Sequence, residues 1–358
     1  METGIIGLKQ SGKSTIFNIL TNNFQDHFPG KKEKKVGIAT VFDERIKFLS
    51  EIYKPKKTTY AQIEYVDMPG VKEGDMKESF FTSSLRNVDA LMNVVQAFET
   101  EMISHPSGSI NVLRDIENLE LELIFSDLFQ IEKRLERIEK DLKKIKDKDL
   151  EREHELLKKF KEFLSQEKPL RNIELSENDE KLIRGYTFLS IKPILHIINI
   201  NESDLDRIKD PVKFFELEEY AKNPRTRIMT ICAKIEEEIA QLPPEDRKLF
   251  MEDLGIEKPA KDRLIRENYS LLGLISFFTV GEDEVKAWTI KKGTTAKKAA
   301  GEIHTDIEKG FIRAEVVKFE DFKKYKSMQK IKELGLMKLE GKEYVVEDGD
   351  IINFRFNV

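Results

Sequence analysis

The residues most able to do chemistry lie near the start of the chain, in the stretch GLKQSGKST. The fixed places of the pattern G-x-x-x-x-G-K-[ST] are filled by Gly7, Gly12, Lys13 and Ser14. Glycines there let backbone N–H groups curl around phosphate oxygens, and the N-terminus of a following helix adds partial positive charge. In such loops the lysine reaches the β and γ phosphates, and the hydroxyl binds Mg²⁺. The pattern predicts a nucleotide phosphate site, rather than a chance turn, over Lys9, Gln10, Ser11, Gly12, Lys13, Ser14 and Thr15.

Strands and a helix must hold this loop. Thr3 to Ile6 are apolar enough for a buried strand, and Thr15 to Leu20 continue as an amphipathic helix. A strand from Ala61 to Val66 then runs into Asp67 and, three residues later, Gly70. In a P-loop protein a D-x-x-G in this place supports Mg²⁺ through the Asp and meets the γ-phosphate through the Gly N–H. We therefore expect Asp67 and Gly70 to join the site, although D-x-x-G alone is more often a turn.

The residue after Gly70 bears on hydrolysis. Ras-like GTPases place there a Gln that orients the attacking water, but this chain has Val71, whose side chain can neither donate nor accept a hydrogen bond. If the protein hydrolyses a nucleotide, another group must position the water.

Two later loops are predicted to face the base. The apolar strand from Pro193 to Ile200 ends in Asn199-Ile200-Asn201-Glu202, where GTPases carry N-K-x-D. The Asp of that motif accepts hydrogen bonds from guanine, whereas Glu202 is one methylene longer and Ile200 replaces the Lys. Guanine selection is therefore weakened and adenine becomes an alternative, with a plain surface turn as the other interpretation. A strand from Arg227 to Cys232 ends in Cys232-Ala233-Lys234, which is similar to the S-A-K loop behind the base of GTPases.

The composition changes sharply from Asp115 to about Arg184. Apolar residues recur at steps of three and four, with charged residues on the other faces, at Leu128, Ile131, Leu135, Ile138, Leu142 and Ile145. The charged run from Lys146 to Asp149 is expected to turn the chain, and a partner helix returns with Leu156, Leu157, Phe160, Phe163 and Leu164. Ser176 is typical of the start of a further helix. The pattern predicts an antiparallel helical hairpin inserted into an α/β domain.

The lysines of this hairpin allow two interpretations. Clusters such as Lys143, Lys144 and Lys146 could contact nucleic acid phosphates. Acidic residues are interspersed throughout, however, and the aromatic residues are expected on the apolar seam. A solvated helical face is the interpretation that the sequence alone favours.

Composition and charge limit the class of protein. The 358 residues suffice for two or three domains, and the net charge of -5 is small for a chain with 35% charged residues, so neither sign dictates a partner. The single cysteine, Cys232, excludes an intramolecular disulfide and is typical of a reducing compartment. No run approaches a membrane span, and a first strand so close to Met1 predicts a cytoplasmic protein without a signal peptide.

The C-terminal residues have the pattern of a compact α+β module. Strands are predicted over Phe277 to Val280 and Val285 to Ile290, as a hairpin. A helix from Ala296 to Ile303, capped by Thr294 or Thr295, precedes a strand from Ile312 to Lys318 and closing strands near Val345, Ile351 and Phe354. Polar residues here are candidate partner contacts, or equally helix-end and turn residues: His304, Asp306, Lys309 and Arg313.

Taken together, these segments resemble the YchF-type Obg-like ATPases, translation-associated relatives of the Obg GTPases. The similarity runs from GLKQSGKST through DIENLELELIFSDL, NINE and LPPEDRKLFMEDLGIEKP to AWTIKKGTTAKKAAGEIHTDIEKGFIRAEV and EDGDIINFRFNV. It implies an α/β P-loop (G-domain-like) domain at 1–114 and 190–273, an inserted helical coiled-coil domain at 115–189, and a TGS domain of β-grasp type at 275–357.

The resemblance also implies residue roles. It attributes ATP preference to an N-x-x-E loop, here Asn199 to Glu202, and assistance to hydrolysis to the His of an H-x-S-G stretch, here His105. The chain departs from the family pattern G-L-P-N-V-G-K-S-T at Lys9, Gln10 and Ser11. It also lacks the Thr that completes the Mg²⁺ shell in the family, because His27 to Glu33 replace a stretch like N-F-P-F-C-T-I. These departures leave nucleotide binding intact and put hydrolysis in question.

These residues predict an ATP-binding, weakly hydrolysing P-loop protein whose nucleotide state controls binding to the ribosome or an RNA-containing partner. Lys13 and His105 would serve hydrolysis, Ser14 and Asp67 would hold Mg²⁺, and the other nucleotide contacts would come from the phosphate loop with Gly70, Asn199, Ile200, Glu202, Cys232 and Ala233. The helical insert and the TGS domain would bind the partner, with no membrane contact, and a monomer is favoured. A GTPase of the same fold and a nucleotide-stabilised scaffold without turnover stay open.

Overall fold

The computed structural model describes residues 1–24, 35–68, 84–99, 105–205 and 208–357. The predictions for Gly70, for Val71 and for His27 to Glu33 therefore lie outside the described residues. The chain divides into two compact units. Unit 1 comprises Met1–Gly37 and Glu64–Lys261, and unit 2 comprises Ile38–Ile63 and Asp262–Val358. Among the described residues, no helix is long and apolar enough to cross a membrane.

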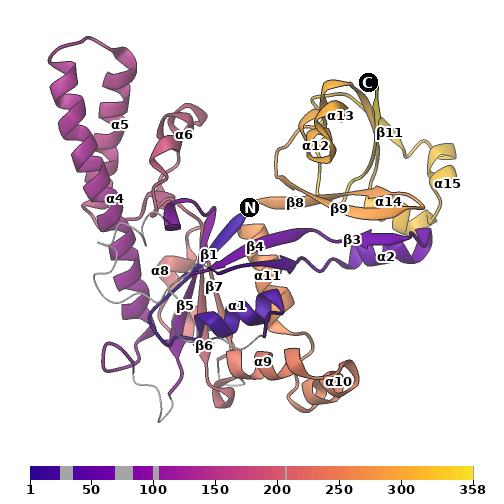
Figure 1. The fold of residues 1–358 in the computed structure, drawn as a ribbon, viewed down its shortest axis with the longest axis horizontal. Helices are drawn as coiled ribbons and strands as arrows, with labels where there is room; N and C mark the ends of the chain where they lie inside the picture. The colour runs from indigo at the N-terminus through magenta and orange to yellow at the C-terminus, as the bar shows by residue number, and fades with distance from the viewer. Residues whose placement is uncertain (25–34, 69–83, 100–104, 206–207, 358) are drawn as a thin grey trace. The chain divides into compact units, whose positions relative to one another are not determined.

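Unit 1 is built on a sheet whose described strands lie in the order β2-β4-β1-β5-β6-β7 (Figure 1). β1 pairs in parallel with β4 and β5, and the pairs β5–β6 and β6–β7 are also parallel. In such a sheet the carboxyl ends of the strands meet at one edge, where ligands of α/β proteins bind. The strands are β1 (Glu2–Ile6), β2 (Lys35–Thr40), β4 (Gln62–Asp67), β5 (Ala90–Ala97), β6 (Ile194–Ile200) and β7 (Thr226–Ile231).

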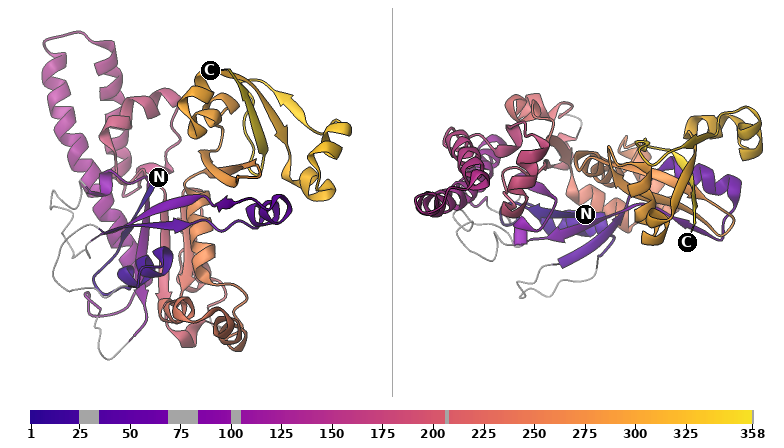
Figure 2. Two further views of the ribbon diagram at one scale, coloured as in Figure 1. Left: turned by 45° about the vertical axis from the view of Figure 1, so that its right-hand side comes forward. Right: turned by 90° about the horizontal axis from the view of Figure 1, so that it is seen from above.

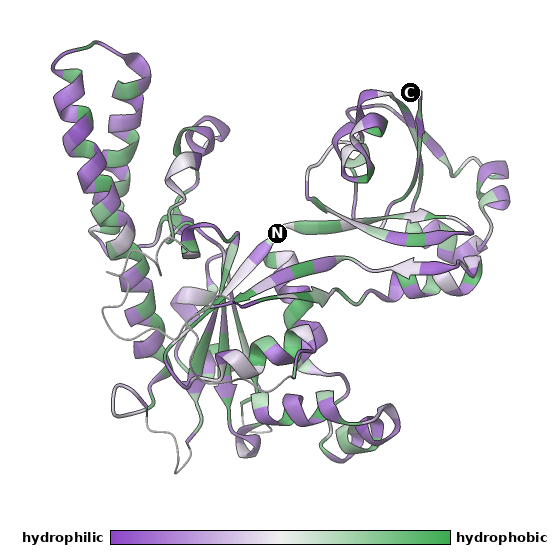
Figure 3. Cartoon of the chain, in the orientation of Figure 1, coloured by the Kyte–Doolittle hydropathy of each residue, from purple (hydrophilic) through white to green (hydrophobic). Residues whose placement is uncertain are grey.

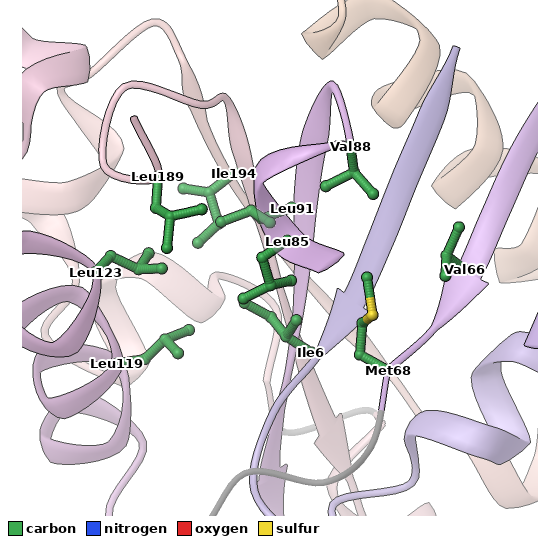
Figure 4. Close-up of a cluster of buried hydrophobic side chains, with 10 residues drawn as sticks. All are labelled: Ile6, Val66, Met68, Leu85, Val88, Leu91, Leu119, Leu123, Leu189 and Ile194. Atoms are coloured by element: carbon green, nitrogen blue, oxygen red, sulfur yellow. The ribbon is translucent and has the colours of Figure 1, made fainter. Parts of the chain in front are cut away.

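Helices cover the buried strands of this sheet, which explains why β5 and β6 read as almost unbroken apolar runs. Figure 4 shows Leu119 and Leu123 of α4 pointing toward Leu189, Leu85 and Ile6. The foot of the helical insert is therefore part of the hydrophobic core that supports the phosphate loop. The helices of unit 1 are α1 (Lys13–Thr21), α4 (Val112–Leu142), α5 (Lys148–Leu164), α6 (Glu177–Ile183), α7 (Pro211–Phe214), α8 (Glu218–Ala221), α9 (Ala233–Gln241) and α10 (Pro244–Asp253).

The predicted helical hairpin is formed by α4 and α5, which lie side by side in both views of Figure 2. Its core is a cluster that includes Ile131, Leu135, Ile138, Leu157, Phe160 and Leu164, and Figure 3 shows hydrophobic and hydrophilic residues alternating along both helices. Asp147 caps α5, and a capping box of Ser176 and Asp179 begins α6, as the sequence indicates.

Two details of the hairpin correct the sequence analysis. Ile145 does not belong to the seam: α4 ends at Leu142, and the Ile145 side chain beyond it is 64% exposed. The expectation that aromatic residues sit on the seam is also wrong for Phe125 and Phe129, which are 57% and 60% exposed. Neither falls on the three-and-four spacing of the buried residues, so the helix turns both rings toward solvent.

Unit 2 contains a mixed sheet with described strands in the order β11-β10-β12-β8-β9-β3. The hairpin β8–β9 is antiparallel as predicted, whereas β12–β8 and β3–β9 are parallel. Helix α12 buries Ala296, Ala299 and Ala300 against this sheet. The elements are β3 (Lys57–Thr59), β8 (Leu274–Val280), β9 (Glu284–Lys291), β10 (Phe311–Val317), β11 (Lys338–Glu340), β12 (Ile351–Phe356), α2 (Glu44–Tyr53), α11 (Ala260–Leu271, which begins in unit 1), α12 (Ala296–Ile303), α13 (Thr305–Lys309), α14 (Phe319–Tyr325) and α15 (Met328–Glu333).

An early segment of the chain completes unit 2. The Arg45 guanidinium on α2 forms ion pairs with Asp43 and Asp348, each at 2.8 Å, and the ring of Tyr53 stacks on that of Phe322. Together with the pairing of β3 and β9, these contacts place residues 38–63 in the C-terminal unit. The division into units therefore differs from the three predicted domains, whose boundaries remain a prediction.

The predicted fold class is confirmed as an α/β P-loop domain with a helical insert and a separate C-terminal domain. The TGS type of the C-terminal domain stays a prediction. One local expectation is wrong: Thr295 occupies the N-cap position of α12, but its side chain makes no capping hydrogen bond. Tyr344 supplies a backbone acceptor instead, for the Ala296 N–H at 2.7 Å.

Candidate functional site

The phosphate loop carries the chain from β1 into α1, and two of its positions accept only glycine. Gly12 has a φ of 97°, and a Cβ there would lie 2.4 Å from Asn199 Nδ2. Gly7 has a φ of 143°, and a Cβ there would lie 2.3 Å from the carbonyl oxygen of Val94. Both the backbone conformation and the close neighbours therefore exclude a side chain.

Lys13 and Ser14 open helix α1 and meet Asp67 at the end of β4. The Lys13 ammonium is buried and donates to the carbonyl oxygen of Leu8 at 2.5 Å. Burial lowers the pKa of Lys13 to about 8, while the Asp67 carboxylate opposes this shift and Lys9 reinforces it. The Ser14 hydroxyl donates to Asp67 Oδ2 at 3.0 Å. Two hard oxygen ligands thus lie together beside a cation, a donor set that suits Mg²⁺ and phosphate.

Asn199 ties two loops together. Its Nδ2 donates to the carbonyl oxygen of Ser11 at 3.1 Å, and its Oδ1 accepts from the backbone N–H of Ala233 at 3.0 Å. The side chain is buried, so both contacts are shielded from water. Asn199 therefore fixes the phosphate loop against the loop between β7 and α9, at the edge where the parallel strands end.

These loops surround one cleft with a volume of about 860 Å³, within the range of small-molecule sites. The predicted residues that line it are Gln10, Gly12, Lys13, Ser14, Thr15, Asn199, Ile200, Glu202, Cys232 and Ala233. Glu202 is exposed, in a short turn after β6, whereas Ile200 packs into a core cluster. Burial raises the pKa of the Cys232 thiol, which favours its neutral form.

Besides His105, three predicted residues are not among those that line the cleft. Lys9 is exposed on the loop, and Ser11 is buried beneath it, where its carbonyl oxygen meets Asn199. Asp67 reaches the site through its hydrogen bond with Ser14. Asn201 and Lys234 of the two predicted base loops also line the cleft, together with three residues that the sequence analysis did not name: Phe98, Ser203 and Glu237. Their position just after β5, β6 and β7 was the available signal, because those strands end at the same edge.

His105 lies apart from the cleft. Its side chain is buried, with Nε2 at 2.7 Å from Asp115 Oδ2, and its Nδ1 accepts from the backbone N–H of Ser107 at 3.2 Å. Nδ1 is therefore hydrogen-bonded, whereas Nε2 lies within ion-pair distance of Asp115 without a hydrogen bond among the described residues. His105 is not one of the residues that line the cleft. Ser107 and Asp115 instead line a separate cavity of about 30 Å³ at the start of the phosphate loop, about the space of one water molecule.

Family comparisons agree with this arrangement. Residues 2–149 match the family described as 50S ribosome-binding GTPase, and residues 274–357 match the family of YchF GTPase C-terminal domains, described as a protein of unknown function. The ribosome-binding ATPase YchF of Bacillus subtilis (strain 168) is 44% identical over 368 residues, covering 100% of both chains. That of Escherichia coli O157:H7 is 41% identical over 362 residues, covering 99% of each.

A solved structure gives the same result for the fold. The YchF GTPase of Schizosaccharomyces pombe has a TM-score of 0.87 and 30% sequence identity, over 99% of this chain and 97% of that chain. The similarity thus extends through the P-loop domain, the helical insert and the C-terminal domain alike. On this full-length similarity, and with the P-loop at the head of a parallel sheet, the chain belongs to the YchF family of Obg-like P-loop proteins.

Proposed function

We propose that this chain is an ATP-binding P-loop protein with weak ATPase activity, whose nucleotide state controls its binding to the ribosome. The observation that carries the proposal is the single cleft that gathers the phosphate loop, the Asn199–Glu202 loop and the Cys232–Ala233 loop. The name of the curated relatives, ribosome-binding ATPase, supports both the activity and the partner. A cytoplasmic location is part of the same proposal.

Each part of a nucleotide has matching residues in the cleft. Backbone N–H groups of the phosphate loop and the N-terminus of α1 would bind the phosphates, with Lys13 as their cation. Ser14 and Asp67 would hold Mg²⁺, which would supply positive charge to the phosphate oxygens. The protein's own task is to orient the triphosphate and neutralise its charge, and the buried, preorganised Lys13 suits that task.

Base selection falls to Glu202 rather than to Asn199. Both polar atoms of the Asn199 side chain are already bonded, to Ser11 and Ala233, so its role is to position the two loops. The Ile200 side chain offers no polar atom and is buried. The exposed carboxylate of Glu202 can accept a hydrogen bond from the 6-amino group of adenine, and its extra methylene moves it from the place where an Asp would read guanine.

Calorimetric titration of nucleotide-free protein with ATP and GTP, each with Mg²⁺, tests this assignment. We expect tighter binding of ATP, and a shift toward GTP in Glu202→Asp, which shortens the side chain and keeps its charge. Glu237→Asp is the matched control, because Glu237 lines the same cleft from α9. Equal nucleotide preference in the wild type and Glu202→Asp would refute the role of Glu202, and a GTP preference of the wild type would make the chain a divergent GTPase.

One observation favours slow turnover or a scaffold without turnover. His105 is held by Asp115 and Ser107, and Val71 cannot orient a water. We infer that His105 assists hydrolysis only after it leaves Asp115, so turnover of the isolated protein is weak. If the wild type releases phosphate no faster than Lys13→Ala does, the protein is a scaffold without turnover and not an ATPase. Release that increases with added ribosomes would support regulated hydrolysis.

A further inference from the structure

Two phenylalanines on the helical insert lie off its buried seam and face solvent. Phe125 and Phe129 lie one turn apart on α4 and are 57% and 60% exposed, while the seam residues Ile124, Ile131 and Leu135 are buried. Residues four apart lie on the same face of a helix. Single exposed apolar residues are ordinary, but neighbouring rings rimmed by polar residues mark an interaction surface.

Positive charge continues the same line of the helix. Lys133 follows Phe129 by four residues, and its ammonium lies 4.0 Å from the Phe129 ring centroid. Arg137 follows by four more and is exposed. Of the nearby acidic side chains, Glu132 pairs with Lys161 at 2.9 Å and Glu153 pairs with Arg134 at 2.7 Å. Lys133 and Arg137 therefore keep their charge available beside the rings, with exposed Glu136 as the acidic border.

A cavity of about 410 Å³ adjoins this line, lined by Gln130, Lys133, Arg134, Arg137, Gly185 and Tyr186. Gln130 is bonded on one side only: Nε2 donates to the carbonyl oxygen of Tyr186 at 3.1 Å, whereas Oε1 is buried without a hydrogen-bond partner among the described residues. A buried acceptor without a partner is unfavourable, and a donor group on a bound molecule would satisfy it.

We propose that this surface, formed by Phe125, Phe129, Gln130, Lys133, Arg137 and Tyr186, binds unpaired bases of RNA. The proposal rests on ribosome binding and names the side of the insert that makes contact. Exposed aromatic rings stack on bases, whose faces are always available in single strands. Lys133 and Arg137 meet the phosphates that join those bases, and the Gln130 oxygen accepts from an exocyclic amino group. An apolar partner protein would use the rings but has no use for the two cations.

The lysine clusters at the tip of the hairpin carry a weaker case. Lys143, Lys144 and Lys146 are exposed, as are the acidic residues Asp141, Asp147 and Asp149 around them. No aromatic ring lies among these tip residues to stack on a base. They can add to long-range attraction, but the specific contact belongs to the surface on α4.

The test uses the full-length protein in two assays: co-sedimentation with ribosomes, and binding of a fluorescently labelled oligouridine RNA. Phe125→Ala with Phe129→Ala is expected to weaken both, by roughly fivefold to a hundredfold for each ring. Lys133→Gln with Arg137→Gln should also weaken both and make RNA binding less dependent on salt. The slope of log K against log salt concentration should be reduced by about 1.4 for the two lost phosphate contacts. Lys158→Gln with Lys159→Gln is the matched control, since both lysines are exposed on α5.

A conservative substitution separates RNA from a protein partner. Phe125→Leu with Phe129→Leu keeps an apolar surface and removes the flat ring, so it should bind RNA as poorly as the alanine variant. Ribosome binding rescued by leucine, with no effect on oligouridine, would overturn the assignment in favour of a ribosomal protein. Ribosome binding equal in all variants would overturn the surface itself while leaving the proposed function intact. A wild type that fails to sediment with ribosomes would instead contradict the proposed function.

Discussion

Replacing Glu120 with glutamine tests how the helical insert is anchored to the sheet. Glu120 lies near the foot of α4 and accepts hydrogen bonds from Arg171 Nη1 at 2.7 Å through both carboxylate oxygens. His196 of β6 approaches the same carboxylate, with Nε2 at 3.6 Å from Oε1, and its Nδ1 bonds to the Asn93 amide on β5. All four side chains are buried. The cluster therefore joins the insert to two central strands through charge and hydrogen bonds.

The pKa of Glu120 shows how much its ionised carboxylate contributes to the free energy of unfolding. Burial alone would raise it, but Arg171 and then His196 outweigh burial and lower the pKa from 4.5 to about 2. A carboxyl group with a lowered pKa in the folded state stabilises the fold above its unfolded pKa and loses that contribution as the pH falls through the folded value. The difference corresponds to about 3 kcal/mol at neutral pH, of which about 2 kcal/mol is lost by pH 3.

In Glu120→Gln the charge is absent at every pH, and Arg171 is left as a buried cation without its partner. We expect the free energy of unfolding at pH 7 to fall by about 3–5 kcal/mol. The gap between wild type and variant should narrow by about 2 kcal/mol at pH 3. Urea unfolding followed by far-ultraviolet circular dichroism, dominated by α4 and α5, measures both values. Fluorescence of Trp288, the single tryptophan, follows unit 2 separately.

Glu136→Gln provides the control for this measurement, because Glu136 is an exposed residue of the same helix. Its effect should stay within about 0.5 kcal/mol. A gap between wild type and Glu120→Gln that is the same at pH 7 and pH 3 would refute the electrostatic reasoning. It would mean that glutamine disturbs the packing and that the paired charge contributes nothing of its own.

Three further variants test the site and the insert. Gly12→Ala places a Cβ against Asn199 at a positive φ, so calorimetry should show at least about tenfold weaker ATP binding; an unchanged affinity would contradict the geometry. Asp115→Asn removes the charged partner of His105, so phosphate release should rise, and the rise should vanish when His105→Ala is added; a fall would mean that Asp115 orients His105 for catalysis. Phe160→Ala removes one ring from the core of the hairpin and should destabilise the hairpin by about 3–5 kcal/mol. Hydrogen exchange in α4 and α5 should become faster, while the ATP affinity should change by less than about twofold, or a few tenths of a kcal/mol.

Local patterns predict the elements of this fold well. The strand before the phosphate loop, helix α12 and the antiparallel hairpin α4–α5 all follow from the periodicity of their apolar residues, because this pattern depends only on neighbours in sequence. The cleft was predictable for a related reason: parallel strands place the residues that follow them at one edge. The residue types and their order along the chain were therefore enough to predict that Ser14, Asp67 and Glu202 belong to one site.

What the sequence did not predict depends on partners far along the chain. The pairing of β3 with β9 and the ion pair of Arg45 with Asp348 join segments with no shared pattern. The hydrogen bonds of the Asn199 side chain could not be predicted from the sequence for a different reason. Its partners are the backbone carbonyl oxygen of Ser11 and the backbone N–H of Ala233, and backbone groups of this kind leave no pattern in a sequence. The exposure of Phe129 was predicted wrongly, because a large apolar ring favours burial whereas its position lies off the three-and-four spacing of the seam.

The discontinuity of unit 2 has a consequence for how the chain is made. Residues 38–63 leave the ribosome early, but their partners in β9, α14 and the segment around Asp348 are synthesised only after all of 64–261. During translation α2 and β3 must therefore wait unpaired, with Tyr53 and the edge of β3 exposed, and closing so long a loop is slow. Unit 2 becomes complete only at the end of synthesis, so a chain released early would keep its phosphate loop and lack a finished C-terminal unit.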